Sequence, residues 1–200
     1  MRNKQFWPRL DIRLRAGISV AAMVALLHCG TAHAVDPSIR LAELQHTAWR
    51  GDDGAPSNIV ALTQTPDGFL WLGTGGGLFR FDGVRFEPMA ALGGQALPNT
   101  SITALYTTPS GILVIGYRFG GVSVFQGDRV RHFSMADGLP LGNAWAFAQG
   151  DDGDLWAAFT DGVARLRAGT WTRLALDGEV LPYRNLLRDA EGNIWVTAKT

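Results

Sequence analysis

The sequence predicts an all-β fold, a β-propeller of four-stranded blades with about three and a half blades present and the ring incomplete. Three observations predict it. A short motif recurs at a period near 40 residues, each copy holds four short apolar runs, and Gly, Pro and Asp separate the runs. A period near 40 with four strands per unit is typical of propeller blades. Helix-pair repeats can have similar periods, but this chain has no long stretch with the 3.6-residue helical period.

The repeat can be aligned on a glycine that precedes the second strand of each unit. The equivalent glycines are Gly68, Gly111, Gly153 and Gly192. They are separated by 43, 42 and 39 residues. An apolar run begins nine residues before each glycine, and we expect the innermost strand of each blade to start there. These starts are Ile59, Ile102, Ala144 and Tyr183.

The clearest hairpin lies in the first unit. The runs Phe69–Leu72 and Leu78–Phe81 read as strands, and the segment Gly73–Gly77 between them reads as a glycine turn. Glycines permit the positive φ that tight hairpins need. A phosphate-binding loop would instead lead into a helix and carry a Lys at its end. The hairpin interpretation therefore fits this segment better.

The predicted blades follow one another along the chain. We expect blade 1 over about Asn58–Met89, blade 2 over Ser101–Met135, blade 3 over Asn143–Leu176 and a fourth blade from Pro182 that stops inside its second strand. The segment Leu41–Trp49 reads as a strand that closes the ring in the last blade, with a short helix as the alternative. Because that strand has no last blade to join, we expect the chain alone to be open and prone to aggregation.

Residues 1–34 read as a secretory signal peptide. A basic region runs to Arg15, the apolar segment Ala16–Leu27 follows, and small residues precede a cleavage site between Ala34 and Val35. An uncleaved anchor and lipid attachment at Cys29 are the alternatives. We therefore predict export to the periplasm, an N-terminal segment over residues 35–57, and propeller blades over residues 58–200.

Composition excludes several classes of function. Beyond residue 34 the chain has 13 basic and 17 acidic residues, which argues against a nucleic-acid-binding surface. Cys29 is the single cysteine, so neither an intrachain disulfide nor a cysteine-based zinc site can form. Beyond the leader, His46 and His132 are the only histidines, and His132 is predicted on the surface of an outer strand without partners. We predict no catalytic residue, no cofactor and no metal.

Two further residue groups have competing interpretations. The carboxylates of Asp151, Asp152 and Asp154 could bind calcium, but their spacing does not match an EF-hand loop and an Asx-type turn is the alternative. The tryptophans at the second strand of three units are expected to lie in the core between blades. They are Trp71, Trp156 and Trp195.

One end of the propeller is the predicted ligand face. In an up-and-down blade, the loop before the innermost strand and the middle hairpin turn lie at the same end, and loops on a rigid scaffold commonly carry recognition. Trp145 could stack there on a sugar-like ligand, with plain packing as the alternative. The candidate ligand-face residues are Asn58, Asn99, Arg118, Asn143 and Trp145.

Several stretches resemble the two-component regulator propeller repeat. They are GFLWLGTGGGLFRFDGVRF (residues 68–86) with the DGAPSNIVALTQTPDG before it, DGLPLGNAWAFAQGDDGDLWAAFTDGVARL (residues 137–166) and DAEGNIWVTAKT (residues 189–200). The resemblance covers about Leu41 to Thr200. Blade 2 departs from it, because Val114 replaces Trp and Gly116-Tyr117 replaces Gly-Thr. In blade 3, Ala157-Ala158 stands in for the apolar-Gly pair.

The resemblance implies a periplasmic sensor of a signalling receptor, without catalytic activity in this chain. Such a sensor would bind an unknown extracytoplasmic ligand, a carbohydrate being one class, and act through the propeller or its homodimer. The family commonly continues into a membrane helix that anchors it in the inner membrane, and then into a histidine kinase or diguanylate cyclase. The alternatives are a stand-alone secreted propeller that binds protein or carbohydrate, and a propeller lyase or hydrolase.

Overall fold

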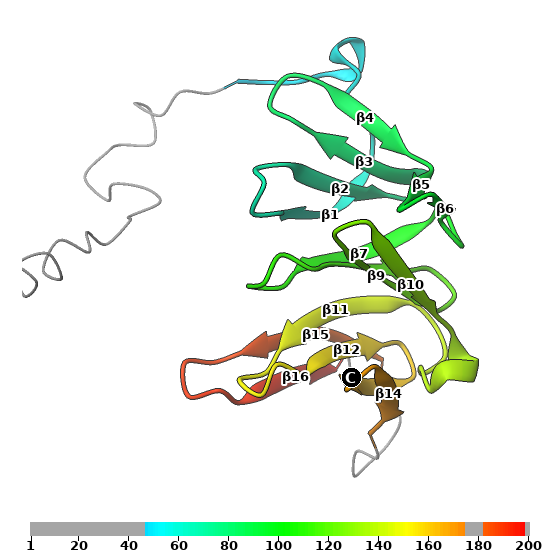
Figure 1. The fold of residues 1–200 in the computed structure, drawn as a ribbon, viewed down its shortest axis with the longest axis vertical. Coiled ribbons are helices and arrows are strands. Elements are labelled where there is room, and N and C mark those ends of the chain that lie inside the picture. Colours follow the sequence, from blue (N-terminus) through cyan, green and yellow to red (C-terminus); the bar gives the residue numbers. More distant parts are fainter. Residues whose placement is uncertain (1–46, 175–181, 199–200) are drawn as a thin grey trace, which may run out of the picture. The chain divides into compact units, whose positions relative to one another are not determined.

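The strands of the chain form successive antiparallel sheets, as the computed structural model shows for residues 47–174 and 182–198. Within the unit Ala48–Thr200 there are three four-stranded sheets, one two-stranded sheet and a small extra hairpin (Figure 1). The propeller blades predicted from the repeat are therefore confirmed, and the described residues do not close a ring. The signal peptide and residues 41–46 of the predicted strand Leu41–Trp49 lie outside the described residues, and the last three residues of that strand, 47–49, are not in a strand, so the prediction is wrong for them.

Each of the first three blades is a simple up-and-down sheet. Blade 1 consists of β1 (Ile59–Gln64), β2 (Leu70–Thr74), β3 (Gly77–Phe81) and β4 (Phe86–Met89). Blade 2 consists of β7 (Ile102–Thr107), β8 (Leu113–Tyr117), β9 (Val122–Gln126) and β10 (Arg129–Phe133). Blade 3 consists of β11 (Ala144–Gln149), β12 (Leu155–Phe159), β13 (Gly162–Arg167) and β14 (Thr170–Arg173). Blade 4 has β15 (Tyr183–Arg188) and β16 (Ile194–Ala198).

The innermost strands begin at the four residues that the repeat predicts. Each also has a register irregularity just after its first residue, for example between Ile102 and Ala104 in β7. An extra residue at such a bulge shifts the alternation of the strand. As a result Ile102 and Leu105 pack toward blade 1, whereas Ala104 and Tyr106 pack toward blade 3.

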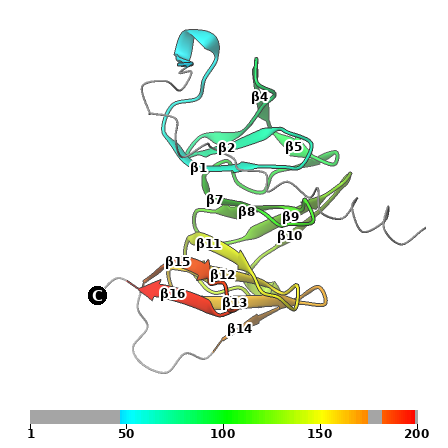
Figure 2. The same ribbon diagram turned by 90° about the vertical axis from the view of Figure 1, so that its left-hand side faces the viewer.

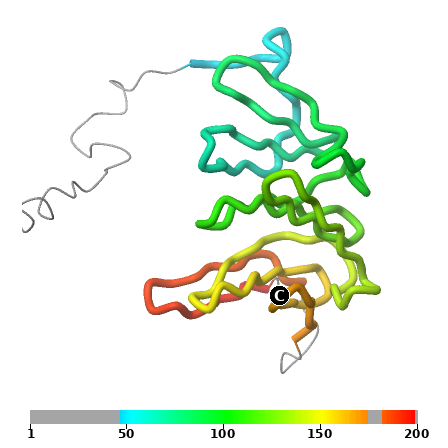
Figure 3. The backbone as a smooth tube through the Cα atoms, viewed as in Figure 1, coloured from blue at the N-terminus to red at the C-terminus, as the bar shows by residue number. Residues whose placement is uncertain are grey.

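The core lies between neighbouring blades and not within any one of them. Figures 2 and 3 show the sheets following one another in chain order. The core between blades 1 and 2 includes Trp71, Leu78, Ile102, Ile115 and Tyr117. The core between blades 2 and 3 includes Val114, Phe133, Phe147, Phe159 and Trp171. A β-sheet that is apolar on both faces needs such partners on both sides.

Close blade packing depends on a glycine in the second strand. A Cβ atom at Gly73 would lie 2.5 Å from Ile102 Cγ2, and one at Gly116 would lie 2.8 Å from Ala144 Cβ. The third blade has Ala158 at this position, fully buried against the fourth blade. The glycine of the repeat lies within the second strand of the blade and allows the neighbouring blade to approach closely.

Some elements are absent from the sequence prediction. The hairpin β5 (Ala91–Leu92) and β6 (Gln95–Ala96) follows blade 1 and buries Leu92 in the core. Two short 3-10 helices, η3 (Gly51–Asp53) and η4 (Met135–Asp137), lie in the connections. The turn in blade 1 is also shorter than predicted, because β2 and β3 extend to leave only two residues between them.

The tryptophans predicted in the core have different environments. Trp71 is 4% exposed and lies in the core between blades 1 and 2, and Trp156 packs in part against blade 4. Trp195 is 60% exposed in the described part of the chain, so the prediction that it lies in the core between blades is wrong. Trp49 is not in a strand and places its ring edge-on against Phe81, with ring centroids 5.0 Å apart. In the described part of the chain, no helix has the length and apolarity needed to cross a membrane.

Candidate functional site

The loops at one end of the blades are joined by backbone and asparagine hydrogen bonds. In blade 2, Arg118 N donates to Ser101 O at 2.9 Å, and Asn99 Nδ2 donates to Arg118 O at 3.0 Å. In blade 3, Thr160 N donates to Asn143 O at 3.1 Å. In blades 2 and 3, the loop before the innermost strand therefore lies against the middle hairpin turn of the same blade. We call this end the loop face.

The middle turn of blade 2 differs from the others. It has four residues, Arg118–Gly121, where blades 1 and 3 have two between their strands. Phe119 has a φ of 66°, a left-handed conformation that is unusual for a bulky residue. Its backbone N donates to Asn143 Oδ1 at 2.9 Å, although its side chain is 77% exposed. Two asparagines of neighbouring loops thus hold the backbone that presents Arg118 and Phe119.

Below this turn lies a buried polar network. Tyr117 Oη and Ser123 Oγ are hydrogen-bonded at 2.8 Å, and Ser123 Oγ lies 2.6 Å from His132 Nδ1. Tyr117 and Ser123 are both fully buried, and burial raises the pKa of Tyr117 to about 12. Among the described residues, no group hydrogen-bonds to the buried Nε2 of His132. The prediction that His132 is a surface residue without partners was therefore wrong.

The network is particular to blade 2. The register of the blades aligns Tyr117, Ser123 and His132 with Thr74, Phe79 and Pro88 in blade 1. The same positions in blade 3 are Phe159, Ala164 and Arg173. A buried polar group costs free energy unless it is hydrogen-bonded, whereas an apolar pair such as Phe159 and Ala164 has no such requirement. Blade 2 therefore carries a polar feature that the fold itself does not require.

The network and the turn share one pocket, which we call the blade 2 pocket. It has a volume of about 450 Å³. Its lining includes Asn99, Arg118, Phe119, His132, Met135 and Asp137. Asp137 accepts hydrogen bonds from Ser134 N at 2.8 Å and Ser134 Oγ at 3.0 Å, and these bonds lower its pKa. The pocket thus combines an aromatic side chain, a guanidinium and a carboxylate that is already hydrogen-bonded.

Two of the predicted ligand-face residues lie elsewhere on the loop face. Asn58, with a φ of 53°, lines a separate hollow with Gly75 and Gly76. Trp145 donates from Nε1 to Thr160 Oγ1 at 3.0 Å. The guanidinium of Arg184, from the next blade, lies 4.1 Å from the centroid of the Trp145 ring. The partly buried indole of Trp145 is therefore engaged in contacts within the protein.

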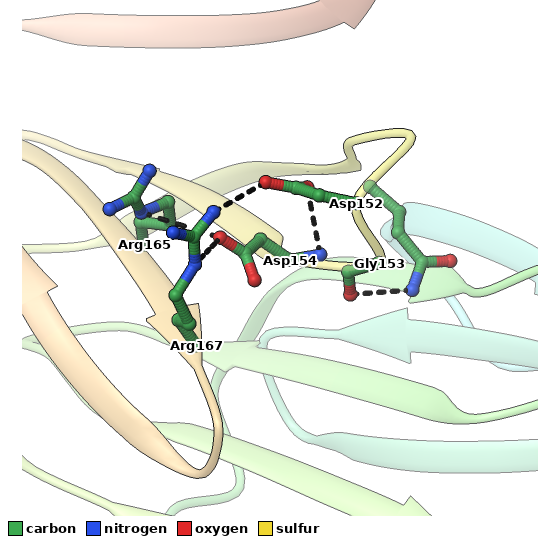
Figure 4. A network of polar contacts seen from close by, with 6 residues as sticks. Asp152, Gly153, Asp154, Arg165 and Arg167 are labelled. Carbon is green, nitrogen blue, oxygen red and sulfur yellow. Dashed lines mark hydrogen bonds and ion pairs between the residues drawn. The ribbon is translucent and has the colours of Figure 1, made fainter.

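The acidic turn of blade 3 is paired with arginines. Arg167 Nε donates to Asp154 Oδ2 at 2.5 Å, and its Nη2 donates to Asp152 Oδ2 at 2.6 Å (Figure 4). Arg165 also approaches Asp154, and Asp151 pairs with Arg188. The backbone N of Asp154 bonds to Asp152 Oδ1, as in an Asx-type turn, and with Arg167 this lowers the pKa of Asp152. The arginine pairs and the turn account for these carboxylates without a calcium ion.

A larger hollow lies at the opposite end of the innermost strands. It has a volume of about 640 Å³ and is lined in part by Tyr106, Asp151, Leu187 and Arg188. Burial raises the pKa of Tyr106, and Asp151 and Arg188 are paired with each other across the wall. The two charged side chains of this hollow therefore neutralise each other. The blade 2 pocket is the better candidate because the polar network beside it departs from the repeat in a way that the propeller fold does not require.

The sequence places Asn99, Arg118 and Asn143 on the loop face, but it does not indicate that Tyr117 and Ser123 lie beside it or that His132 has partners. The available signal was the departure of blade 2 from the repeat, where Gly116-Tyr117 stands in place of Gly-Thr. The partner residues lie on different strands, and only the strand register brings Ser123 opposite His132.

Comparison with known proteins agrees with the fold. The model of the "Two component regulator propeller" family matches residues 53–76, which confirms the resemblance for the first repeat. Among curated proteins, none has a sequence that matches this chain.

Three solved structures illustrate the structural similarity. The extracellular domains of two hybrid two component systems of B. thetaiotaomicron, BT3049 and BT4673, match with 17% and 21% identity and TM-scores of 0.59 and 0.55. They cover 69% and 73% of this chain, which spans only 20% and 21% of theirs. A virginiamycin B lyase from Staphylococcus aureus matches with 11% identity and a TM-score of 0.58, over 70% of this chain and 49% of its own. At these identities the similarity supports the propeller fold alone.

Proposed function

This chain carries the repeat of the two-component regulator propeller family, and we propose from that premise that it is a non-catalytic, extracytoplasmic sensor module of a signalling receptor. Its ligand binds on the loop face, and the output enzyme, a histidine kinase or a diguanylate cyclase, lies outside these 200 residues. The observation that carries the proposal is the blade 2 pocket, where the Tyr117–Ser123–His132 network and a held Arg-Phe turn occupy positions at which the residues of blades 1 and 3 form no such network.

A binding role explains why blade 2 departs from the repeat. The four-residue turn places a strained, exposed Phe119 beside Arg118, and three hydrogen bonds fix their backbone. Strained backbone conformations cluster at ligand sites. They cost free energy, so they persist only where the surrounding structure holds them in place. A turn whose backbone is held in advance loses less entropy when a ligand arrives, which favours binding.

An enzymatic role is the competing candidate, since a lyase shares the fold. Ser123 and His132 are residue types that serve elsewhere as a nucleophile and its general base, and Ser123 Oγ lies 2.6 Å from His132 Nδ1. However, Ser123 is fully buried and its Oγ is shared with Tyr117, so a substrate carbonyl has no path to it. A nucleophile must be within reach of the substrate, and this geometry therefore supports a structural network.

The proposal is tested by separating binding, turnover and response. The purified chain is screened by thermal shift against pools of oligosaccharides, organic acids and peptides. A pool that raises the Tm of the chain is incubated with the chain and analysed by mass spectrometry. The same pool is then given to two kinds of cell, one that produces the receptor with the chain intact and one in which the chain is deleted. We expect the pool to be recovered unchanged and to cause a transcriptional response only in the cells with the intact chain.

Two results would redirect the proposal. Chemical conversion of the pool by the chain would make it a propeller enzyme. Binding without conversion, together with the same transcriptional response in cells that lack the chain, would make it a stand-alone binding propeller.

A further inference from the structure

We propose that the blade 2 pocket binds a small organic carboxylate with an apolar body, Arg118 pairing with the carboxylate and Phe119 with Met135 contacting the body. This assignment rests on the proposed function, because it names the class of ligand for the same surface. It follows from the charges, the exposed apolar side chains and the hydrogen-bonding groups around the pocket.

Arg118 supplies the positive charge. It is exposed, and no carboxylate in residues 47–174 and 182–198 forms an ion pair with it. The carboxylate of Asp137 lines the same pocket but is held by the backbone and hydroxyl of Ser134, and the nearby Arg131 offsets its charge. The guanidinium of Arg118 is therefore the charge that a ligand can neutralise.

The turn orients this guanidinium for a planar anion. Its carbon lies 5.1 Å from the centroid of the Phe119 ring, which restricts its position while leaving N–H donors at its edge. The planar guanidinium donates two parallel hydrogen bonds to a carboxylate, and such charge-assisted pairs are among the stronger hydrogen bonds. The backbone of Arg118 is bonded on both sides, through its N–H and its carbonyl oxygen.

Two exposed apolar side chains lie on the wall of the pocket. Phe119 is 77% exposed and Met135 is 54% exposed, and both line the pocket. Its volume of about 450 Å³ lies within the range of roughly 300–1,000 Å³ typical of sites for small molecules. An aromatic ring or an aliphatic chain would cover both side chains and remove apolar area from water.

The polar groups of the wall do not suit a ligand with many hydroxyls. The side chain of Asn99 is used at both ends, by Arg118 O and by Ser101 N. The Oδ2 of Asp137 is likewise engaged, with Ser134 N and Ser134 Oγ. The Nε2 of His132 has no hydrogen-bond partner among the described residues, but it is buried and is not exposed to a ligand in the pocket. A ligand with a single anionic group on an apolar body fits the polar groups of this pocket better than a sugar does.

The test uses four small probes and calorimetry on the purified chain. Phenylacetate carries the anion and the apolar body, phenylacetamide is its neutral analogue, acetate lacks the body, and galacturonate has a polar body. We expect phenylacetate to bind at least about tenfold more tightly than each of the other three, as one charge-assisted pair on an apolar body implies. Equal binding of phenylacetate and phenylacetamide, equal or tighter binding of galacturonate, or no binding of phenylacetate overturns the assignment.

Variants of exposed arginines check the position of the site. Arg118→Gln should weaken phenylacetate about tenfold or more while leaving phenylacetamide unchanged. Arg129→Gln is the matched control, since Arg129 is an exposed arginine at the opposite end of β10 from His132, and it should leave both affinities unchanged. Tm must be retained in both variants. An Arg118→Gln variant that folds and binds phenylacetate normally would contradict the assignment.

The two proposals fail in different ways. If phenylacetate does not bind but another pool binds and triggers a response that requires the chain, the sensor function stands and the ligand class is wrong. If phenylacetate binds through Arg118 but no bound compound changes transcription, the site stands and the sensor function is wrong.

Discussion

Removing the hydroxyl of Ser123 should cost more than removing the hydroxyl of Tyr117, although the second residue is far larger. Ser123 is the centre of the network, with Tyr117 Oη at 2.8 Å and His132 Nδ1 at 2.6 Å. Ser123→Ala leaves the buried hydroxyl of Tyr117 and one nitrogen of His132 without a partner. A buried polar group left without a hydrogen-bond partner costs about 1–3 kcal/mol. Because His132 is only partly buried, we expect Ser123→Ala to lower the free energy of unfolding by about 2–4 kcal/mol.

Tyr117→Phe removes the hydroxyl itself and leaves Ser123 bonded to His132. The expected loss is about 0.5–1.5 kcal/mol, the net value of one hydrogen bond. The double variant Y117F/S123A leaves no tyrosine hydroxyl without a hydrogen-bond partner. Its Phe and Ala are the same pair that blade 3 has at Phe159 and Ala164. We therefore expect the double variant to be more stable than Ser123→Ala alone, by about 1–2 kcal/mol.

Urea unfolding followed by tryptophan fluorescence measures these free energies, provided that the transition is two-state. The exposed Ser57→Ala is the control for loss of a serine hydroxyl without burial, and it should be neutral. The reasoning is refuted if Ser123→Ala is no more destabilising than Tyr117→Phe, or if the double variant is less stable than Ser123→Ala. Either result would mean that Ser123 does not satisfy the buried hydroxyl.

Three further predictions follow from the blade 2 pocket and the blade packing. The pKa of Tyr117 is raised from its ordinary value of 10.0 to about 12, so below pH 10 it contributes no pH dependence. From about pH 10 to 12 stability falls by about 1.4 kcal/mol per pH unit as the unfolded chain loses the proton first, and urea unfolding of Tyr117→Phe should lack this part of the loss. Gly73→Ala should destabilise by about 1–3 kcal/mol against Ile102, whereas Gly75→Ala meets no atom within 4 Å and should be nearly neutral by the same assay. Phe119→Asn relieves a left-handed strain of about 1–2 kcal/mol and loses an exposed contact with Arg118 worth about 0.5 kcal/mol, so Tm should rise by about 2–4 °C while phenylacetate binding weakens. A fall in Tm would contradict the strain argument.

Much of the fold could be predicted because its signals are local. The innermost strands begin at the four residues that the 40-residue period indicates, and positive-φ glycines occupy the turns before the second strands. Alternation along a strand and turn chemistry act over a few residues, so they are legible in the sequence. The hairpin β5–β6 was missed, because its two-residue strands are shorter than any periodic signal.

The repeat, the strand starts and a loop face that includes Asn99, Arg118 and Asn143 can be predicted from the sequence alone. Three features appear only in the folded chain: Tyr117, Ser123 and His132 form one buried network, Arg184 covers Trp145, and the acidic turn of blade 3 is paired with arginines. These features join residues that are separated along the chain. Strand register and blade packing bring together residues that no local pattern relates, and burial then determines which polar groups need one another.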